Sequence, residues 1–277
     1  MDAGQIEKAL EGLPVGPVRY FEQTGSTNDE AAHWVDEGAP DLALVIANEQ
    51  RAGRGRLNRR WFTPPDSALA VSVILRPTSQ TERSANILRI TALASLALCG
   101  ALQDEYRLQA EIKWPNDVLI NGRKAAGILV EAQWDGEYPS AFILGIGVNA
   151  SPAALPPEDE LLFPAISVEE AAGSAVDRLR LLRALLAHMI HWRGLLHSQA
   201  FLQAWEARLA FRGERVRVWG AGLPVKNQTS AQEFLEAELL GLDERGGLRL
   251  RDDLGKVISI HSGEIRLRPA PPAKENL

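Results

Sequence analysis

Short apolar runs separated by turn-forming residues dominate the first half of the chain. Residues 41–49 (DLALVIANE) and 67–76 (SALAVSVILR) are rich in aliphatic and β-branched residues, and both end in Gly- or Pro-bearing stretches. Such runs are typical of strands. Three further candidates follow at 110–114, 127–133 and 140–148. Because all of them are short and bounded by turn formers, we expect a mixed or antiparallel sheet rather than a doubly wound one.

Helical spacing appears in two regions. Between Ser84 and Gln103 the apolar residues recur at helical intervals, and Ser84 is a candidate N-cap. This pattern predicts a long, mostly buried helix. The Pro-rich stretch 151–164 cannot be regular throughout. It is followed by an amphipathic region, 168–209, that we expect to form supporting helices.

The pattern changes again in the last quarter of the chain. Charged and apolar residues alternate over 215–219, and Gly-rich turns at 220–222 and 246–247 separate further short strands. We therefore expect two domains, residues 1–210 and residues 211–277. The second is expected to be a small β-barrel that ends in a frayed, Pro-rich tail.

Composition limits the classes of function. The chain has 277 residues and a net charge of −6, which argues against a broad binding surface for nucleic acid or for an anionic membrane. Any phosphate chemistry must therefore be local. Cys99 is the only cysteine, which excludes a disulfide within the chain and a thiolate metal cluster. Its place in an apolar run predicts a buried core thiol.

No targeting or membrane-spanning segment is expected. The N-terminus lacks a basic start followed by an apolar core, and no stretch approaches the apolar length that crosses a bilayer. We therefore expect a cytoplasmic protein without membrane contact. Roughly 20 residues precede the first motif, about half the minimum for an independent domain, so no N-terminal DNA-binding module is expected.

The strongest chemical signal is the Arg-rich loop, residues 50–61 (QRAGRGRLNRRW), which holds five arginines and no acid. Guanidinium groups bind phosphates with paired donors, and Gly53 and Gly55 let the main chain approach a ligand. Charge alone would favour a solvated basic loop or a nucleic-acid patch. The interleaved glycines and the closing Trp61 favour an anion-binding loop, which we expect to be mobile until an anion orders it.

A second signal is Lys113-Trp-Pro-Asn-Asp117, followed by the tight-turn dipeptide Asn121-Gly122. Together they predict a hairpin. Pro115 favours an extended residue before it, so Lys113 should end a strand, with Asn116 and Asp117 in the turn. Asn and Asp are also ordinary turn residues, so their presence alone does not establish a function.

Three further positions could meet a ligand. Lys124 comes just before small residues and Gly127, where a ligand can lie close to the backbone, although a lysine at a strand start is often only a solvated edge charge. The segment 25–28 (GSTN) is a good N-cap sequence whose amides and hydroxyls also suit a polar ring or an anion. Residues 145–149 (GIGVN) form a strand against whose glycines something must pack.

In this order, the segments resemble the biotin protein ligase family, the biotin–[acetyl-CoA-carboxylase] ligases. The matching stretches span nearly the whole chain, and the glycine–arginine loop separates this family from the related lipoate ligases and octanoyltransferases. They are STN (26–28), the GRGR loop with Gln50 and Trp61, KWPND (113–117), RKAAGILVE (123–131) and GIGVN (145–149).

The resemblance implies a fold and a reaction. The fold is α+β, a mixed sheet with helices like the catalytic domains of class II aminoacyl-tRNA synthetases, plus a C-terminal SH3-like β-barrel over 211–270. Biotin and MgATP would give biotinyl-5′-AMP. One lysine of a biotin carboxyl carrier domain, in acetyl-CoA carboxylase or a related carboxylase, would then take the biotin.

The resemblance also implies roles for individual residues. Lys124, Arg54 and Arg56 would be the catalytic cations, and Asp117 is a candidate Mg²⁺ ligand. The implied biotin contacts are Ser26, Thr27, Asn28, Gln50, Gly53, Arg54, Gly55, Arg56, Lys124, Gly127 and Gly145. The implied contacts to ATP and the adenylate are Trp61, Lys113, Asn116 and Asn149.

Some alternatives stay open at this stage. Leu57 and Asn58 stand where family members often carry Arg and Gly, so the loop's hold on the intermediate is undecided. Without a helix-turn-helix segment no DNA partner is expected, and a homodimer is possible in principle. The competing functions are a lipoate-type ligase on the same scaffold, a non-catalytic sensor of biotin or biotinyl-AMP, and a nucleic-acid binder that uses the Arg-rich loop.

Overall fold

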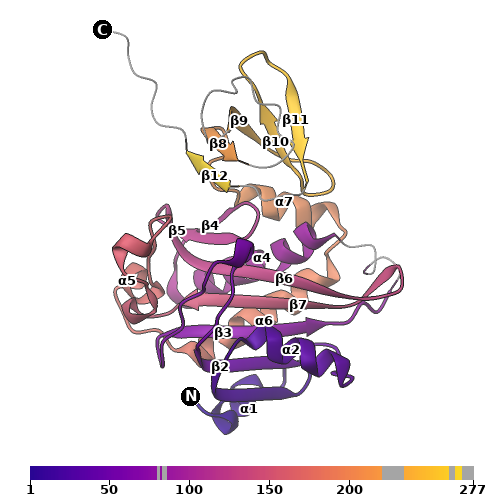
Figure 1. Cartoon of the computed structure of the whole chain (residues 1–277), viewed down its shortest axis with the longest axis vertical. Helices are drawn as coiled ribbons and strands as arrows, with labels where there is room; N and C mark the ends of the chain where they lie inside the picture. The colour runs from indigo at the N-terminus through magenta and orange to yellow at the C-terminus, as the bar shows by residue number, and fades with distance from the viewer. Residues whose placement is uncertain (80–81, 83–85, 220–233, 262–265, 270–277) are drawn as a thin grey trace.

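The computed structural model describes residues 1–79, 82, 86–219, 234–261 and 266–269. The turn predicted at 220–222, the capping role predicted for Ser84 and the last eight positions of the predicted tail lie outside these residues. A large sheet with helices on both faces carries a smaller sheet at one end (Figure 1).

The large sheet is mixed, as predicted. Its strand order is β1-β2-β3-β7-β6-β5-β4, with β1 parallel to β2 and the other pairs antiparallel. All five strands predicted for this region are present. The strands are β1 (Val18–Thr24), β2 (Leu44–Gln50), β3 (Ala68–Leu75), β4 (Ala110–Lys113), β5 (Asp117–Ile120), β6 (Arg123–Asp135) and β7 (Tyr138–Asn149).

The sequence pattern predicts the β5–β6 hairpin of this sheet but not its edge strand β1. The edge strand β1 was not predicted, because its apolar residues are interrupted by Arg19, mostly half-buried, and too few to form an apolar run. The hairpin between β5 and β6 is confirmed. Ile120 pairs with Arg123, and Asn121 and Gly122 both have positive φ, as a two-residue hairpin turn requires.

One face of the large sheet is covered by α4 (Ile87–Tyr106) and α6 (Arg178–Gly194). The N-cap of α4 is Asn86, whose side chain accepts a hydrogen bond from Arg89 N at 2.9 Å. Every residue from Ile90 to Leu102 is buried, as predicted for this helix. Cys99 lies among them, and burial raises the pKa of its thiol to about 12.

By length and composition, α4 could cross a membrane. The expectation that no apolar stretch is long enough to cross a bilayer was therefore wrong. However, 72% of its apolar window is buried inside the protein. The apolar residues of α4 are therefore accounted for by the core between the sheet and α6.

The remaining helices complete the layers. On the opposite face of the sheet, α2 (Thr27–Asp36) packs Trp34 and Val35 against β2, β3 and β7. The amphipathic region predicted over 168–209 is three helices, because Gly173 adopts positive φ and a second break follows Gly194. The other helical segments are α1 (Ala3–Leu10), α5 (Val168–Ala172), α7 (Gln199–Ala207), η1 (Arg56–Asn58), η2 (Pro152–Ala154) and η3 (Glu158–Glu160).

The smaller sheet contains five antiparallel strands in the order β11-β10-β9-β8-β12. Strands were predicted here, and their closure into an SH3-like barrel stays a prediction. The strands are β8 (Arg215–Trp219), β9 (Leu235–Leu242), β10 (Leu248–Arg251), β11 (Val257–Ile260) and β12 (Arg266–Pro269).

The turn between β9 and β10 fastens the smaller sheet to the larger one. Three successive carbonyl groups in this turn, those of residues 244, 245 and 246, each accept a side-chain hydrogen bond. The donors are Arg89 and Asn86 at the start of α4, and the indole of Trp114 just after β4, which lies 3.0 Å from the Gly246 oxygen. Trp205 of α7 packs against Gly246 itself.

Substitution of Gly246 should therefore destabilise the protein more than an otherwise similar change. Gly246 and Gly255 have nearly the same φ, +81° and +79°, but a Cβ at 246 would lie 2.3 Å from the Trp205 ring whereas one at 255 would meet nothing within 4 Å. Both Gly→Ala variants carry the positive-φ strain. We expect Gly246→Ala to lower the free energy of unfolding, measured in urea, by about 1–3 kcal/mol more than Gly255→Ala does. Equal losses would contradict this.

Candidate active site

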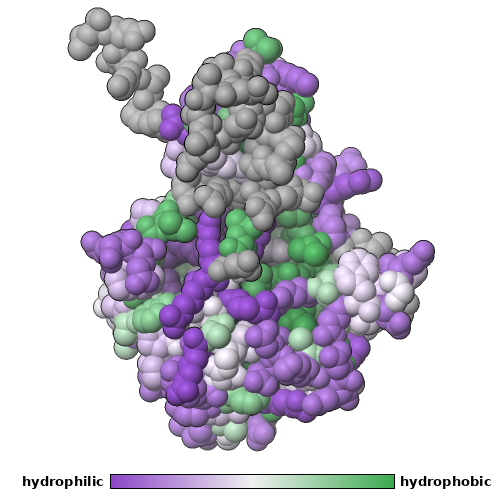
Figure 2. All heavy atoms as spheres, viewed as in Figure 1, coloured by the Kyte–Doolittle hydropathy of each residue, from purple (hydrophilic) through white to green (hydrophobic). Residues whose placement is uncertain are grey.

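A cavity of about 600 Å³ opens on the sheet beside the Arg-rich loop. This volume lies in the range of small-molecule binding sites. On the face drawn in Figure 2, strongly hydrophilic and apolar side chains lie next to one another near the middle of the molecule. Every predicted site residue except Gly53 lines the cavity.

The polar end of the cavity is built where β2 ends and α2 begins. Gln50 Oε1 accepts hydrogen bonds from Thr27 N at 2.9 Å and Thr27 Oγ1 at 3.1 Å. Gln50 Nε2 donates to Thr63 Oγ1 at 3.1 Å. Ser26 is the N-cap residue by position, but its side chain does not cap the helix, so the capping predicted from the STN sequence is not observed. All four residues are buried.

Two more residues extend this polar end. The hydroxyl of Ser72, fully buried in β3, hydrogen-bonds Asn28 Oδ1 at 2.6 Å and Thr27 Oγ1 at 2.8 Å. Asn28 lies directly on β7, because a Cβ on Gly145 would come within 2.3 Å of Asn28 Oδ1. The prediction that something packs on Gly145 is confirmed. Ser72 was missed, although a serine inside the apolar run ALAVSVIL is a visible signal.

Two lysines converge on one buried carboxylate in the middle of the cavity. Lys113 Nζ lies 2.8 Å from Asp117 Oδ2, and Lys124 Nζ lies 2.6 Å from Asp117 Oδ1. Burial acts to raise the pKa of Asp117, but the ammonium groups of Lys124 and Lys113 outweigh it and hold this pKa well below its usual value. The Lys124 side chain is 26% exposed, which leaves it accessible to a ligand.

This arrangement does not fit the Mg²⁺ ligand expected at Asp117. Each of its carboxylate oxygens contacts a lysine ammonium group. Within the described parts of the chain, no three His, Cys, Asp or Glu side chains come together as metal ligands. The contacts instead make Asp117 the residue that orients Lys124 and Lys113.

Trp61 lies flat against glycines of the two central strands. A Cβ on Gly147 would come within 2.3 Å of Trp61 Nε1, and one on Gly127 within 3.1 Å of Trp61 Cζ3. At Gly127 the group that approaches the backbone is thus Trp61, and the approach of a ligand there stays a prediction. Lys124 Nζ lies 5.4 Å from the centre of the Trp61 ring. The indole therefore forms one wall of the space that Lys124 faces.

Gly53 has a different role from the ligand contact predicted for it. It is buried below the loop, where Trp61 N donates to Gly53 O at 2.8 Å and a Cβ would lie 2.5 Å from Trp61 O. Gly53 thus shapes the base of the Arg-rich loop. Its tip is the η1 turn, in which Leu57 adopts the left-handed conformation with φ 60°.

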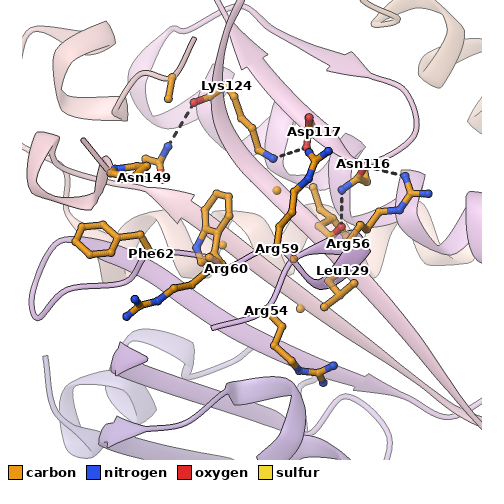
Figure 3. A pocket seen from close by; sticks show the side chains of 18 of the residues that line it. Arg54, Arg56, Arg59, Arg60, Phe62, Asn116, Asp117, Lys124, Leu129 and Asn149 are labelled. Atoms are coloured by element: carbon orange, nitrogen blue, oxygen red, sulfur yellow. Dashed lines mark hydrogen bonds and ion pairs between the residues drawn. The ribbon is translucent and has the colours of Figure 1, made fainter. Parts of the chain in front are cut away.

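The arginines of the loop point in different directions (Figure 3). Arg54 turns away from the Lys124–Asp117 pair and hydrogen-bonds Glu131 at 2.9 and 2.8 Å and Asp29 at 2.7 Å. Protein carboxylates therefore neutralise Arg54 in this structure, and its predicted part as a catalytic cation stays a prediction. Arg59, which was not predicted, extends toward the Lys124–Asp117 pair.

Two amide side chains predicted to contact the adenylate hold the backbone of the cavity. Asn116 Nδ2 donates to Ile128 O at 3.1 Å, and its Oδ1 accepts from Arg56 Nη1 at 3.2 Å. Asn149 Nδ2 donates to Lys124 O at 3.3 Å. Both residues line the cavity, and both also fix the strands that carry the charged groups.

The far wall comes from the Pro-rich stretch, whose part in the site was not predicted. Lys124 N donates to Pro164 O at 2.8 Å, and Ile166 N donates to Lys124 O at 3.0 Å. The stretch thus runs alongside the start of β6. Phe163 lies under Lys113, with 4.6 Å between the ammonium nitrogen and the ring centre. A composition rich in proline predicts irregular backbone, but it does not say what that backbone covers.

These groups together suit the binding of a polar ring next to an anion. Hydroxyl and amide groups gather at one end of the cavity, lysines lie in the middle, and an aromatic ring on glycines forms a wall. Among the described residues that line the cavity, none is Cys or His, so Ser26 and Thr27 have no imidazole base there. The fixed charges favour catalysis by positioning and charge stabilisation.

Comparison with known proteins shows which family the chain resembles. Residues 20–149 match the Biotin/lipoate A/B protein ligase family. The biotin–[acetyl-CoA-carboxylase] ligase of Paracoccus denitrificans is 35% identical over 249 residues, which cover 85% of this chain and 95% of that protein. The chain belongs to the biotin/lipoate A/B protein ligase family.

Other members of the biotin/lipoate A/B protein ligase family match over most of the chain. The bifunctional ligase/repressor BirA of Bacillus subtilis is 32% identical over 90% of this chain and 73% of its own length. The biotin protein ligase of Aquifex aeolicus, solved with biotin and ATP, superposes with a TM-score of 0.76 at 25% identity, covering 92% of this chain and 99% of that one. The resemblance read from the motifs is thus confirmed at the level of the family.

The lysine–carboxylate cluster predicts how stability depends on pH. Removing one partner of a buried pair costs about 3–5 kcal/mol, so Asp117→Asn should be less stable than wild type at pH 7 by about this amount. Because the folded-state pKa of Asp117 is lowered, the ionised carboxylate makes its full contribution to the stability of the protein above the unfolded-state pKa, about 4. This contribution is lost as the pH falls toward the folded-state pKa.

The measurement is urea unfolding of wild type and Asp117→Asn from pH 7 downward. The difference between their free energies of unfolding should be constant above pH 4. It should become smaller below pH 4, because the unfolded-state pKa is about 4. Asp36→Asn, at an exposed position at the end of α2, is the control and should match wild type at every pH. A difference that stays constant below pH 4 would contradict the assigned role.

Proposed function

We propose that this protein joins biotin to ATP to form biotinyl-5′-AMP and then transfers the biotin to a lysine of a carrier domain. The observation that carries the proposal is that one cavity brings together three kinds of group: buried hydroxyl and amide groups around Thr27, Lys124 beside Asp117, and Trp61 on its glycines. These groups suit a ureido ring, a carboxylate meeting a phosphate, and a nucleotide base. The similarity to the Paracoccus biotin–[acetyl-CoA-carboxylase] ligase and to the Aquifex biotin protein ligase supports the same proposal.

The ring end binds through groups that are already fixed. A ureido ring offers one carbonyl acceptor and two N–H donors. We assign their recognition to Ser26, Thr27 and Gln50, with Asn28 beside them. The Thr27–Gln50 and Ser72–Asn28 hydrogen bonds hold these side chains in place before any ligand enters. Little ordering of side chains would then accompany binding.

The first step brings two anions together. The biotin carboxylate attacks the α-phosphorus of ATP, which enters as its magnesium complex; an oxygen–phosphorus bond forms and pyrophosphate leaves. Lys124 is the cation nearest this event in the proposal, and its ion pair with Asp117 fixes where the ammonium group lies. Arg56 and Arg59 supply further positive charge from the loop. Fixed cations of this kind stabilise the charge that develops in phosphoryl transfer.

The second step needs no nucleophile from the protein. The amine of the carrier lysine attacks the acyl carbon of the mixed anhydride, an amide bond forms and AMP leaves. The Arg-rich loop limits access of water to the anhydride until the carrier arrives. We propose the biotin carboxyl carrier domain of acetyl-CoA carboxylase or a related carboxylase as the acceptor. A cytoplasmic location, where ATP is available, belongs to this proposal.

The two sheets divide this work. We propose residues 1–210 as the catalytic domain and residues 211–277 as the smaller domain fastened to it. In support, every described residue that lines the cavity comes from the first range. The three carbonyl contacts of the β9–β10 turn join the second range to α4 and to Trp114.

One assay tests the proposed function. The purified chain, given biotin, MgATP and a carrier domain, should release pyrophosphate and label one carrier lysine with biotin. Lipoate in place of biotin should release none, which separates the proposal from a lipoate ligase. Pyrophosphate release without labelling would contradict the transfer step. Binding of biotin with neither product would indicate a sensor instead.

Replacement of Lys124 should separate catalysis from folding. We expect Lys124→Ala to lower the rate of biotin-dependent adenylate formation by about 10²–10³-fold, as the loss of a charge-stabilising group does. The rate is measured by single-turnover formation of biotinyl-AMP, with circular dichroism as a check on folding. Lys8→Ala, at an exposed site on α1, is the control and should be unaffected. An unchanged rate in Lys124→Ala would remove this residue from the mechanism.

A further inference from the structure

Glu131 joins two parts of the site that are far apart in the sequence. It lies in β6, with side-chain oxygens that accept from Arg54 Nη1 and Nη2 at 2.9 and 2.8 Å. The oxygen that accepts from Nη2 also accepts from Asn28 Nδ2, at 2.6 Å. One carboxylate thus holds the Arg-rich loop and the first turn of α2 together.

The hydrogen bonds continue from Asn28 to the polar end of the cavity. Asn28 Oδ1 accepts from Ser72 Oγ, which lies 2.8 Å from Thr27 Oγ1, and the backbone N of Thr27 donates to Gln50 Oε1. The path from the loop to the polar end is therefore unbroken, and each member is part of a strand or of α2. It cannot shift freely, because Asn28 is pressed against the backbone of Gly145.

Glu131 itself does not line the cavity, whereas Asn28 and Arg54 do. It is thus placed to position other residues rather than to touch a ligand. The Arg54 and Glu131 side chains are 42% and 35% exposed, so their ion pair contributes little to overall stability. Asp29 Oδ1 also accepts from Arg54 Nη2, at 2.7 Å, whereas Asn28 Nδ2 donates to Glu131.

We propose that Glu131 couples closure of the Arg-rich loop to occupation of the polar end of the cavity. A ligand that fixes Asn28 fixes the carboxylate of Glu131, and this carboxylate then holds Arg54 and the loop over the cavity. Because coupling between two sites is reciprocal, loss of the Arg54 contact should in turn weaken binding at the polar end. The inference rests on the proposed function, since it takes biotin as the ligand at that end.

A double-mutant cycle with biotin-dependent pyrophosphate release tests the coupling. In the wild-type background, Arg54→Ala should raise the KM for biotin about tenfold, which lies within the usual range of coupling between two sites. In the Glu131→Ala background, the same substitution should raise this KM less than about twofold. The kcat should change less than about threefold in each single variant, because neither residue is proposed to stabilise the transition state. An equal rise of KM in both backgrounds, or an effect on kcat alone, overturns the proposal.

Two control variants separate the coupling from a general loss of charge. In Asp29→Ala, Arg54 keeps its two bonds to Glu131, so Arg54→Ala should still raise the KM for biotin in that background. Arg19→Ala breaks an exposed ion pair of similar length, 2.8 Å to Glu37, that has no contact with the cavity, and it should leave the KM unchanged. Loss of the Arg54 effect in Asp29→Ala would contradict the role given to Glu131.

A second measurement does not depend on catalysis. Trypsin cleaves after arginine, and the loop offers five such bonds. Biotin alone should slow cleavage of the loop in wild type and have no effect in Glu131→Ala. Protection by biotin in both proteins would overturn the proposal. If wild type releases no pyrophosphate with biotin, the proposed function fails; if it does and the cycle is additive, only the coupling fails.

Discussion

The charge on Asp117 is the constraint around which the site is arranged. A buried carboxylate is stable only beside cations, so the end of β4, the start of β5 and the start of β6 must meet for Lys113 and Lys124 to reach it. The Asn121-Gly122 turn sets the register that allows this meeting. As a result, Lys124 holds its ammonium group at a fixed point in the cavity, and the neighbouring walls are placed relative to it.

Much of the fold can be predicted from the chain because apolar runs report burial directly. The strands β2, β3 and β7 and the helix α4 are buried almost throughout, and each was predicted within a few residues. The edge strand β1 could not be, since its half-buried residues carry no such run. The breaks within 168–209 were missed because an amphipathic pattern continues across a glycine whose positive φ depends on the chain around it.

The site was predictable where residue types stand out from their surroundings. Nearly every residue that the motifs indicated lines the cavity, whereas the wall from the Pro-rich stretch carried no such signal. The sequence does not show which partner each charged side chain binds in the folded protein. Arg54 lines the cavity as predicted, but its ion pair with Glu131, 77 positions later, was not predicted. Asp117 was expected to meet a metal ion, but two lysines occupy it. Such pairings depend on the sheet order and not on the local pattern.

The glycine contacts of the central strands have a consequence for how this site could change. Gly127, Gly145 and Gly147 leave bare backbone in the floor of the cavity, and Trp61 and Asn28, inserted from outside the sheet, lie on it. This part of the floor cannot be remodelled by larger side chains, because a Cβ at 145 or 147 would displace an inserted residue. New ligand preferences in proteins with this site would therefore arise by exchange of the two inserted side chains, while the strands beneath them stay the same.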